Sequence, residues 1–205
     1  MLQTVRNNSP LSFLAPTRYF AGIKSDIMDS VYAKQNDTNW CWAACIEMIA
    51  KYNGVNIGQE HFAHSYCGVN QYGHIKNCPA PVDIITSNLN WCAYTGWNRK
   101  KTHCIKTSVR YGKPNLDALI ALLRQNKPVI IAYNTGSDVG HAVVLTGISY
   151  DDGVFGKELN YIVVRDPANG KLVYRNTNQL LNAIYAWWVP TVTKYQTTND
   201  LWKLM

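Results

Sequence analysis

The first half of the chain shows the hydrophobic spacing of helices. From Trp40 to Lys51, apolar positions repeat every three or four residues and form one face of a helix. Asn39 or Thr38 is placed to cap the start of this helix, and Asn53-Gly54 to end it. Two shorter helices are predicted after it, over residues 59–66 and 81–89.

The second half opens with one more helix and then changes to strands. Asn115 is placed to cap a helix that the Lys127-Pro128 pair closes. Stretches rich in β-branched and aromatic residues then predict strands: PVIIAYN, HAVVLTGISY, YIVVRD, KLVYR and AIYAWWV. Asp152-Gly153 and Asn169-Gly170 are typical of hairpin turns. We therefore expect an α+β fold, with a helical lobe followed by an antiparallel β lobe and a cleft between them.

This order of elements suggests how the chain is divided. Residues 1–30, which contain Pro10 and Pro16, look irregular and are expected to form an arm or a linker. A single domain is expected over residues 31–190, with a helical lobe at about 31–113 and a β lobe at about 114–190. Within the first lobe, residues 91–113 are ambiguous and can hold two short strands. Residues 191–205 form a C-terminal tail.

The composition is that of a folded domain. The chain has 205 residues, of which 47% are apolar and 16% charged, enough to bury a core. The 13 tyrosines and seven tryptophans favour a rigid core and an aromatic-lined cleft. No stretch approaches the ~20 apolar residues of a membrane helix. The N-terminus lacks the basic and apolar pattern of a signal peptide.

The charge of the chain is positive but dispersed. The formal net charge is +7, and the densest cluster is Arg99, Lys100 and Lys101, followed by Lys106, Arg110 and Lys113. A basic surface can attract acidic proteins, nucleic acid or anionic membranes. No nucleic-acid motif accompanies the charge. We therefore do not expect nucleic acid as the main partner, and the charge is typical of a solubilising surface.

Six cysteines raise the question of disulfides. Cys41 and Cys45 are expected one helical turn apart, with side chains that do not face each other. Two local bridges are compatible with the spacing, Cys67 with Cys78 and Cys92 with Cys104. Such bridges would indicate an oxidising compartment.

A metal site is the alternative for part of this region. Zinc-type ligands form a loose cluster at His61, His64, Cys67, His74 and Cys78. Their spacing fits no standard zinc pattern, because the chain contains no CxxC. We favour disulfides or buried thiols, and we expect no cofactor.

One cysteine is placed to be reactive. A thiolate is the nucleophilic form of cysteine, and the N-terminus of a helix favours negative charge. Cys41 stands at such an N-terminus, whereas Cys45 lies one turn inside the helix. The alternative for either residue is a buried, inert thiol.

Three further residues could complete a catalytic group. His141 starts a strand, after Gly140, where it can point into a cleft as a general base. Asp166 ends the strand YIVVRD, and pairing of the two strands would let it orient the imidazole. Gln35 precedes the first long helix and could donate to an oxyanion. Taken singly, each residue has an ordinary structural explanation.

Together these residues resemble a known family. The run Trp40-Cys41-Trp42-Ala43-Ala44-Cys45 resembles the nucleophile helix of papain-like cysteine proteases, and Gln35 lies at the spacing of their oxyanion glutamine. The sequences NWCWAAC and GHAVVL look most like those of the bacterial branch, which includes avirulence effectors, secreted toxins and the peptidase domains of bacteriocin transporters.

The resemblance implies a two-lobed papain-like fold and a role for each matching residue. Cys41 would be the nucleophile, His141 the base, Asp166 the orienting acid and Gln35 the oxyanion donor, while Trp40, Trp42 and Gly140 would bind substrate. The expected function is a cysteine endopeptidase, with a protein or peptide as substrate and a cognate immunity or inhibitor protein as a partner. The protein would be a bacterial effector or toxin, secreted or delivered into the cytoplasm of a target cell.

Other functions remain open at this point. The same triad could serve deamidation, transglutamination, peptide ligation or leader-peptide processing, because cleft shape selects the acyl acceptor. A non-enzymatic alternative is a basic, cysteine-bridged module that binds an acidic partner. A zinc-stabilised regulatory domain is a third possibility.

Overall fold

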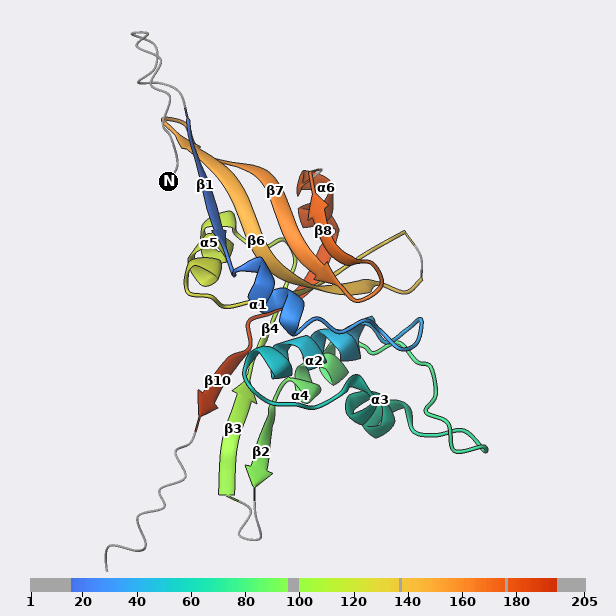
Figure 1. Ribbon diagram of the computed structural model, residues 1–205. Helices are drawn as coiled ribbons and strands as arrows, with labels where there is room; N and C mark the ends of the chain where they lie inside the picture. The colour runs from blue at the N-terminus through green and yellow to red at the C-terminus, as the bar shows by residue number, and fades with distance from the viewer. Residues whose placement is uncertain (1–15, 96–99, 137, 176, 195–205) are drawn as a thin grey trace, which may run out of the picture.

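The computed structural model of the protein describes residues 16–95, 100–136, 138–175 and 177–194, and the side chains of these residues except 93–103 and 194. Helices from the first half of the chain gather in one half of the molecule, and the larger sheet forms the other half together with the helices that follow residue 114 (Figure 1). This arrangement confirms the predicted α+β fold with a helical lobe and an antiparallel β lobe.

The first lobe is built around one buried helix. Helix α2 (Cys41–Tyr52) packs against α3 (Gln59–Cys67) and α4 (Val82–Asn88). All of its residues from Cys41 to Ala50 are buried, because the sheet covers the side that α3 and α4 leave open. A small sheet in the order β10-β3-β2 lies below this lobe in Figure 1 and is formed by β2 (Trp91–Thr95), β3 (Lys100–Lys106) and β10 (Thr191–Lys194).

The second lobe is an antiparallel sheet. Its order is β4-β9-β5-β6-β7-β8, and β1 also pairs with β6. The strands are β1 (Thr17–Gly22), β4 (Val109–Tyr111), β5 (Val129–Tyr133), β6 (His141–Gly153), β7 (Gly156–Asp166), β8 (Gly170–Tyr174) and β9 (Ile184–Trp188). Helices α5 (Leu116–Arg124) and α6 (Thr177–Ala183) belong to this lobe. Asn115 caps α5 as predicted, accepting a hydrogen bond from the Ala118 N–H at 3.1 Å.

Strand β6 is the centre of the molecule, because both of its faces are covered. Ala142 and Val144 join the hydrophobic cluster that contains α2. Val143 and Leu145 point the other way, into the cluster that contains α5. This alternation explains why HAVVLTGISY is apolar at almost every position, and it fixes the side of the sheet on which His141 emerges.

The β6–β7 hairpin brings the two predicted polar strand ends together. Val144 pairs with Arg165 near the open end of the hairpin, and Gly153 pairs with Gly156 at its closed end. His141 and Asp166 therefore lie at the same edge of the sheet. This pairing is the one that the sequence predicted. The tip of the turn is Val154-Phe155, two residues beyond the predicted Asp152-Gly153.

Other predictions need correction. Residues 17–30 are not irregular, since they form β1 and then α1 (Ser25–Ser30). Helix α6 was not predicted at all.

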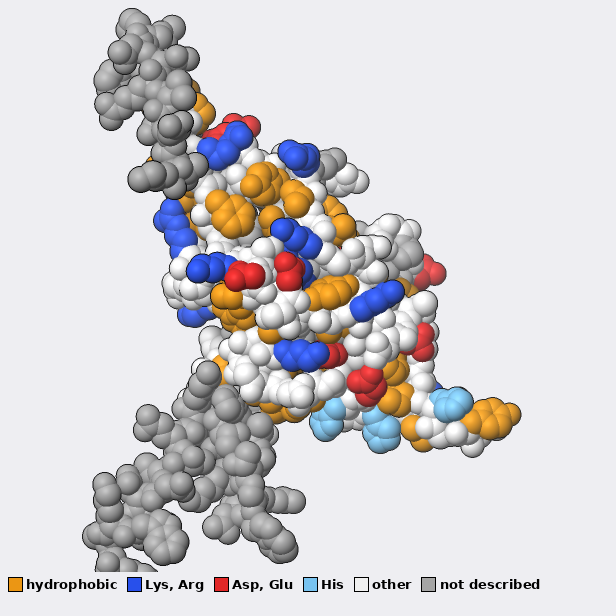
Figure 2. Space-filling model, viewed as in Figure 1, with side chains coloured by type: hydrophobic (Ala, Val, Ile, Leu, Met, Phe, Trp, Pro, Cys, Tyr) orange, Lys and Arg blue, Asp and Glu red, His pale blue; other side chains and the backbone are white. Residues whose placement is uncertain are grey.

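The side chains of Arg99, Lys100 and Lys101 lie outside the described residues. On the face drawn in Figure 2, Lys and Arg side chains are spread singly rather than gathered in one patch. None of the described helices has the length and hydrophobicity to cross a membrane.

Candidate active site

The Cys41 thiol lies at the first residue of α2. A short turn leads into the helix, in which the Trp40 N–H donates to the Asp37 carbonyl at 3.1 Å. Cys41 is 7% exposed and lines a cavity between the lobes. In the described chain, no hydrogen bond from the Cys41 N–H appears, as is usual in the first turn of a helix. The helix N-terminus therefore combines a cysteine that lines the cavity with an unpaired backbone amide on the same residue.

Cys45 is a different kind of thiol. It is fully buried one turn further along α2. Burial raises the pKa of Cys45 well above its usual value, and negative charge at Cys41 and Asp166 raises it further. Cys45 therefore stays protonated and inert, as expected for the second cysteine of the run.

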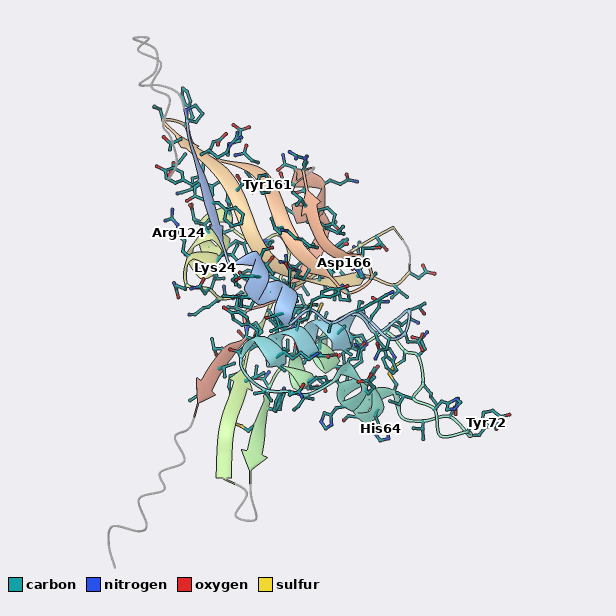
Figure 3. The ribbon with its side chains drawn as sticks, in the orientation of Figure 1. Lys24, His64, Tyr72, Arg124, Tyr161 and Asp166 are labelled. Carbon is teal, nitrogen blue, oxygen red and sulfur yellow. A yellow bond between two sulfur atoms is a disulfide. The ribbon has the colours of Figure 1, made fainter. Side chains whose placement is uncertain are left out.

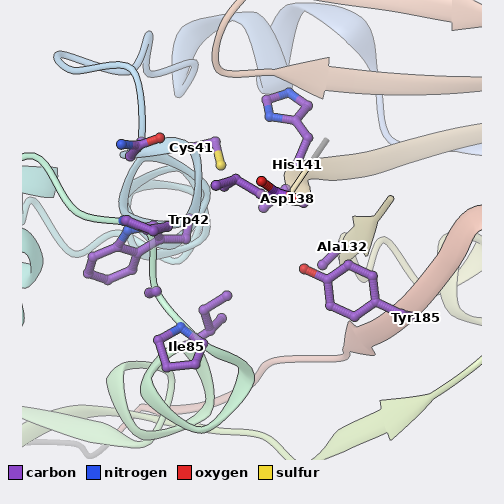
Figure 4. Close-up of a pocket in the computed structure, with 14 residues that line it drawn as sticks. Cys41, Trp42, Ile85, Ala132, Asp138, His141 and Tyr185 are labelled. Carbon is purple, nitrogen blue, oxygen red and sulfur yellow. The ribbon is translucent and has the colours of Figure 1, made fainter. Parts of the chain in front are cut away.

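His141 lies between the thiol and a carboxylate. Its Nε2 is 2.8 Å from Oδ1 of Asp166, and Cys41 lies near enough to affect its pKa. Figure 4 shows the Cys41 sulfur and the His141 ring at the same end of the cavity. Burial lowers the pKa of His141, but the hydrogen bonds to Asp166 and Cys41 outweigh it and raise this pKa to about 9. The imidazolium is thus the favoured form at neutral pH.

Asp166 is held as an anion by its neighbours. It lies at the end of β7 that faces α2 (Figure 3). Its carboxylate accepts from the Ala168 N–H at 2.8 Å and from the Asn169 amide at 3.2 Å. Burial raises the pKa of Asp166, yet the hydrogen bonds from His141 and Ala168 outweigh burial and lower this pKa below its usual value. The carboxylate can therefore orient the imidazole and stabilise its positive charge.

The turn after Asp166 is tied to the segment before α2. The Tyr32 hydroxyl donates to the Asp166 carbonyl at 3.0 Å, and the Gln35 N–H donates to the Pro167 carbonyl at 3.0 Å. These contacts join the two lobes directly beside the site. The sequence contained no signal for Tyr32.

Gln35 does not present a free amide to the cavity. Its Nε2 donates to the carbonyls of Asp37 at 3.0 Å and Thr38 at 2.8 Å, which engages both of its hydrogens. Its Oε1 is buried and has no hydrogen-bond partner in the described chain. In this arrangement Gln35 stabilises the turn that leads to Cys41. To donate to an oxyanion, its amide must first break its hydrogen bonds to these carbonyls.

The three residues expected to bind substrate are placed differently. Trp42 and Gly140 line the cavity. Trp40 does not line it, because its ring is buried in the core of the helical lobe and its Nε1 donates to the Lys76 carbonyl at 3.4 Å. Trp40 therefore supports α2 rather than contacting a ligand.

The cavity has a volume of about 310 Å³ and walls from both lobes. Sequence reasoning missed most of the lining residues: Asn39, Pro79, Ala80, Pro81, Ile85, Ala132, Asp138, Val139 and Tyr185. The packing of Tyr185 requires glycine at position 140, since a Cβ there would lie 2.6 Å from the Tyr185 hydroxyl oxygen. No pattern in the sequence indicates which strand residue faces Gly140.

The other four cysteines form two disulfides, Cys67–Cys78 and Cys92–Cys104. These are the two pairs that the spacing favoured. The first bridge lies next to the cavity, because the Trp42 Nε1 donates to the Cys78 carbonyl at 3.2 Å and Pro79 follows directly. Cys67 and Cys78 are thereby engaged with each other, and the part of the chain that the structure describes holds no group of three or more potential metal ligands.

Comparisons with known proteins add to this geometry. Among solved structures, the chain is similar to the peptidase domain of Streptococcus ComA, a bi-functional ABC transporter involved in quorum sensing, with 14% identity and a TM-score of 0.48 over 78% of this chain and 96% of that one. It is also similar to a double glycine motif protease from an AMS/PCAT transporter, solved with the leader peptide, with 19% identity and a TM-score of 0.45 over 77% and 89%.

A comparison with curated proteins gives no match. A protein-family model does match, the one described as the Peptidase_C39 like family, and it spans residues 27–195. This range includes Cys41, His141 and Asp166 and covers most of the chain. The protein therefore belongs to the Peptidase_C39 like family, and it is a papain-like cysteine peptidase.

Proposed function

We propose that the protein is a cysteine endopeptidase that cuts a protein or peptide substrate with Cys41 as nucleophile, His141 as acid and base, and Asp166 as the orienting residue. One observation carries this proposal. The Nε2 of His141 contacts the Asp166 carboxylate, and His141 and Cys41 line the same cavity, close enough for Cys41 to raise the pKa of His141. Adjacent nucleophile and base, with the base oriented by a third group, is the arrangement that covalent catalysis needs.

The reaction is an acyl transfer. The Cys41 thiolate attacks the scissile carbonyl carbon, and the carbonyl electron pair moves to oxygen. The imidazolium of His141 then gives its proton to the leaving amine as the carbon–nitrogen bond breaks, which leaves a thioester on Cys41. Water, deprotonated by His141, attacks the thioester and releases the carboxylic acid and the thiolate.

The oxyanion is stabilised by donors at the start of α2. The Cys41 N–H is the first donor, because it lies in the unpaired first turn of the helix. Gln35 is proposed as the second donor. Its side-chain amide would break a hydrogen bond to a backbone carbonyl and donate to the oxyanion instead. The positive end of the helix dipole favours the same charge.

The test is direct. The protein is incubated with a cell lysate, and newly formed N-termini are compared with those made by Cys41→Ala. A matched control is Cys45→Ala, which removes a thiol one turn away that has no place in the reaction. We expect new N-termini with the unsubstituted protein and with Cys45→Ala, and none with Cys41→Ala. Equal products from all three proteins would refute the assignment.

The same site could perform a related transfer, and the products distinguish the cases. Endopeptidase activity, including the processing of a leader peptide, yields two fragments. Deamidation leaves the chain intact with a mass gain of about one dalton, and transglutamination joins a glutamine carboxamide to an amine with loss of ammonia. Intact-mass analysis of a cleaved or modified substrate therefore decides among them.

We also propose that the protein is a bacterial effector or toxin, secreted or delivered into a target cell and controlled by a cognate inhibitor protein. The two disulfides support passage through an oxidising compartment. Isolation of the protein from its source, with alkylation of free thiols before lysis, tests this. Four alkylated cysteines at positions 67, 78, 92 and 104 would contradict the proposal.

A further inference from the structure

A carboxylate without a partner lies in the wall of the active-site cavity. Asp138 belongs to the loop between β5 and β6 and precedes His141 by three residues. It lines the cavity together with Cys41 and Val139, and Figure 4 draws it below the His141 ring, on the same side of the cavity as Cys41. In the described chain it makes no hydrogen bond or ion pair, so its charge is available to a ligand.

The loop itself does not explain an aspartate at this position. Aspartates in loops commonly accept a hydrogen bond from a backbone N–H two residues on and thereby shape the turn. Asp166 does this with Ala168, at 2.8 Å. Asp138 accepts no such bond in the part of the chain that the structure describes, and its side chain is exposed. The loop therefore does not need this carboxylate for its conformation.

The charges around the cavity leave Asp138 uncompensated. Among the described residues that line the cavity, none is Lys or Arg. The positive charge of His141 is paired with the Asp166 carboxylate, at 2.8 Å. Burial raises the pKa of Tyr185, so this residue stays neutral. One negative charge remains, in a protein whose formal net charge is +7.

The rest of the wall is apolar. Pro79, Ala80, Pro81 and Ile85 face the cavity from the helical lobe. A long side chain with a methylene stem and a charged end can cover such a surface and still reach a carboxylate. Lysine and arginine are the residues with this form.

We propose that Asp138 determines specificity by binding a cationic nitrogen of the substrate, supplied by a Lys or Arg side chain within two residues of the cut, on the side of the leaving amine. The side follows from the loop, because Asp138 is joined through Val139 and Gly140 to His141, the residue that protonates the leaving amine. This inference rests on the proposed endopeptidase function and adds a substrate class to it.

The experiment uses a library of peptides derived from a proteome, digested by the full-length protein and sequenced by mass spectrometry. Asp138→Asn removes the charge and keeps the shape, and Asp138→Lys reverses the charge. Asp26→Asn is the matched control, since Asp26 is an exposed carboxylate on α1, outside the cavity, and its loss changes the net charge equally. Thermal unfolding of each variant establishes that it is folded.

We expect Lys and Arg to be enriched at the first two positions after the cut with the unsubstituted protein and with Asp26→Asn. The enrichment disappears with Asp138→Asn and turns into a preference for acidic residues with Asp138→Lys. On a synthetic peptide pair that carries Lys or norleucine at the enriched position, the ratio of kcat/KM values falls from about tenfold to about one in Asp138→Asn. The change appears mainly in KM.

Three results would overturn the inference. Cleavage without a basic preference, or with a preference that survives Asp138→Asn, removes Asp138 from specificity and leaves the endopeptidase function intact. A peptide that is cut with a free N-terminus and spared when acetylated assigns the cationic nitrogen to the α-amino group. If the unsubstituted protein cuts no peptide, the proposed function fails and the inference fails with it.

Discussion

Replacing Asp166 by asparagine tests whether the carboxylate sets the charge of His141. Asparagine has the same shape but no charge. The Asp166 and Cys41 contacts together raise the pKa of His141 from 6.5 to about 9 against the effect of burial. That difference corresponds to about 3 kcal/mol in favour of the imidazolium. If Asp166 supplies about half, the substitution costs the imidazolium roughly 1 to 2 kcal/mol, and His141 titrates about one pH unit lower.

The hydrogen bonds of the carboxylate change as well. In the native site, the Nε2–H of His141 and the Ala168 N–H both donate to Oδ1 of Asp166, and Oδ2 accepts from the Asn169 amide. An asparagine oxygen in the place of Oδ1 keeps the first two hydrogen bonds and turns its NH₂ group toward the Asn169 amide. A neutral oxygen then faces the imidazolium of His141. We expect kcat/KM to fall by about 5- to 30-fold, which is the equivalent of the 1 to 2 kcal/mol lost.

Two measurements check this reasoning. The ring of His141 is titrated by NMR in protein labelled at histidine, with His141→Ala used to assign its resonance among the five histidines. The pH dependence of kcat/KM is measured beside it. We expect the alkaline limb of the profile to follow the His141 titration and to move to lower pH in Asp166→Asn. A His141 that still titrates near pH 9 in the variant would refute the reasoning.

The titration of His141 also contributes to the free energy of unfolding, and the direction of its pKa shift determines the sign of this contribution. The folded-state pKa of His141 lies above its unfolded value, so its contribution is fully present below about pH 6.5 and is lost as pH rises through about 9. Asp166→Asn should therefore destabilise the protein by roughly 1 to 2 kcal/mol at pH 6 and by less at pH 9.5. Urea unfolding at the two pH values measures the difference. An equal loss at both would assign the effect to packing.

Three further substitutions test single features of the site. Gln35→Ala is expected to lower kcat about 10²-fold with little change in Tm if its amide reaches the oxyanion, whereas a loss of Tm with unchanged kcat would leave it as a brace for the turn. Cys67→Ser with Cys78→Ser should lower the free energy of unfolding by about 2 to 4 kcal/mol. It should also raise KM, because the bridge holds the cavity wall. An unchanged KM in the folded variant would contradict this role of the bridge. Gly140→Ala should raise KM about tenfold by displacing Tyr185, and Gly140→Ala combined with Tyr185→Ala should recover part of the loss; no recovery would show that the clash lies elsewhere.

The sequence predicted the parts of the fold that depend on hydrophobic spacing. Helix α2 and strands β5, β6, β7 and β9 carry strong patterns, because each is buried on at least one face. Strand β1 carries none, since four of its six residues are exposed. It forms because β6 is long enough to offer an unpaired edge beyond β5, and a short sequence holds no information about that edge.

The candidate site divides in the same way. Cys41, His141 and Asp166 could be predicted because each stands at the end of a helix or strand, where local signals are readable. Asp138, Tyr185 and the Pro79–Pro81 segment lie together only after the lobes pack, and they come from parts of the chain far apart in sequence. Trp40 shows the limit of motif reasoning, since a tryptophan next to the nucleophile is used for the core rather than for the cavity.

The contacts between the Asp166 turn and the segment before α2 explain how two lobes can hold three catalytic groups in register. Asp166 is fixed through its own backbone, since its carbonyl accepts from Tyr32 and the next carbonyl accepts from Gln35. Both donors lie within ten residues of Cys41 in the sequence. A movement of one lobe against the other that separates Cys41 from His141 must therefore also break these hydrogen bonds. Because Gln35 both braces the turn and is proposed to face the oxyanion, substrate binding and the alignment of Asp166 are coupled through one residue. The geometry of the site is thus maintained where the lobes meet, by polar contacts that neither hydrophobic core supplies.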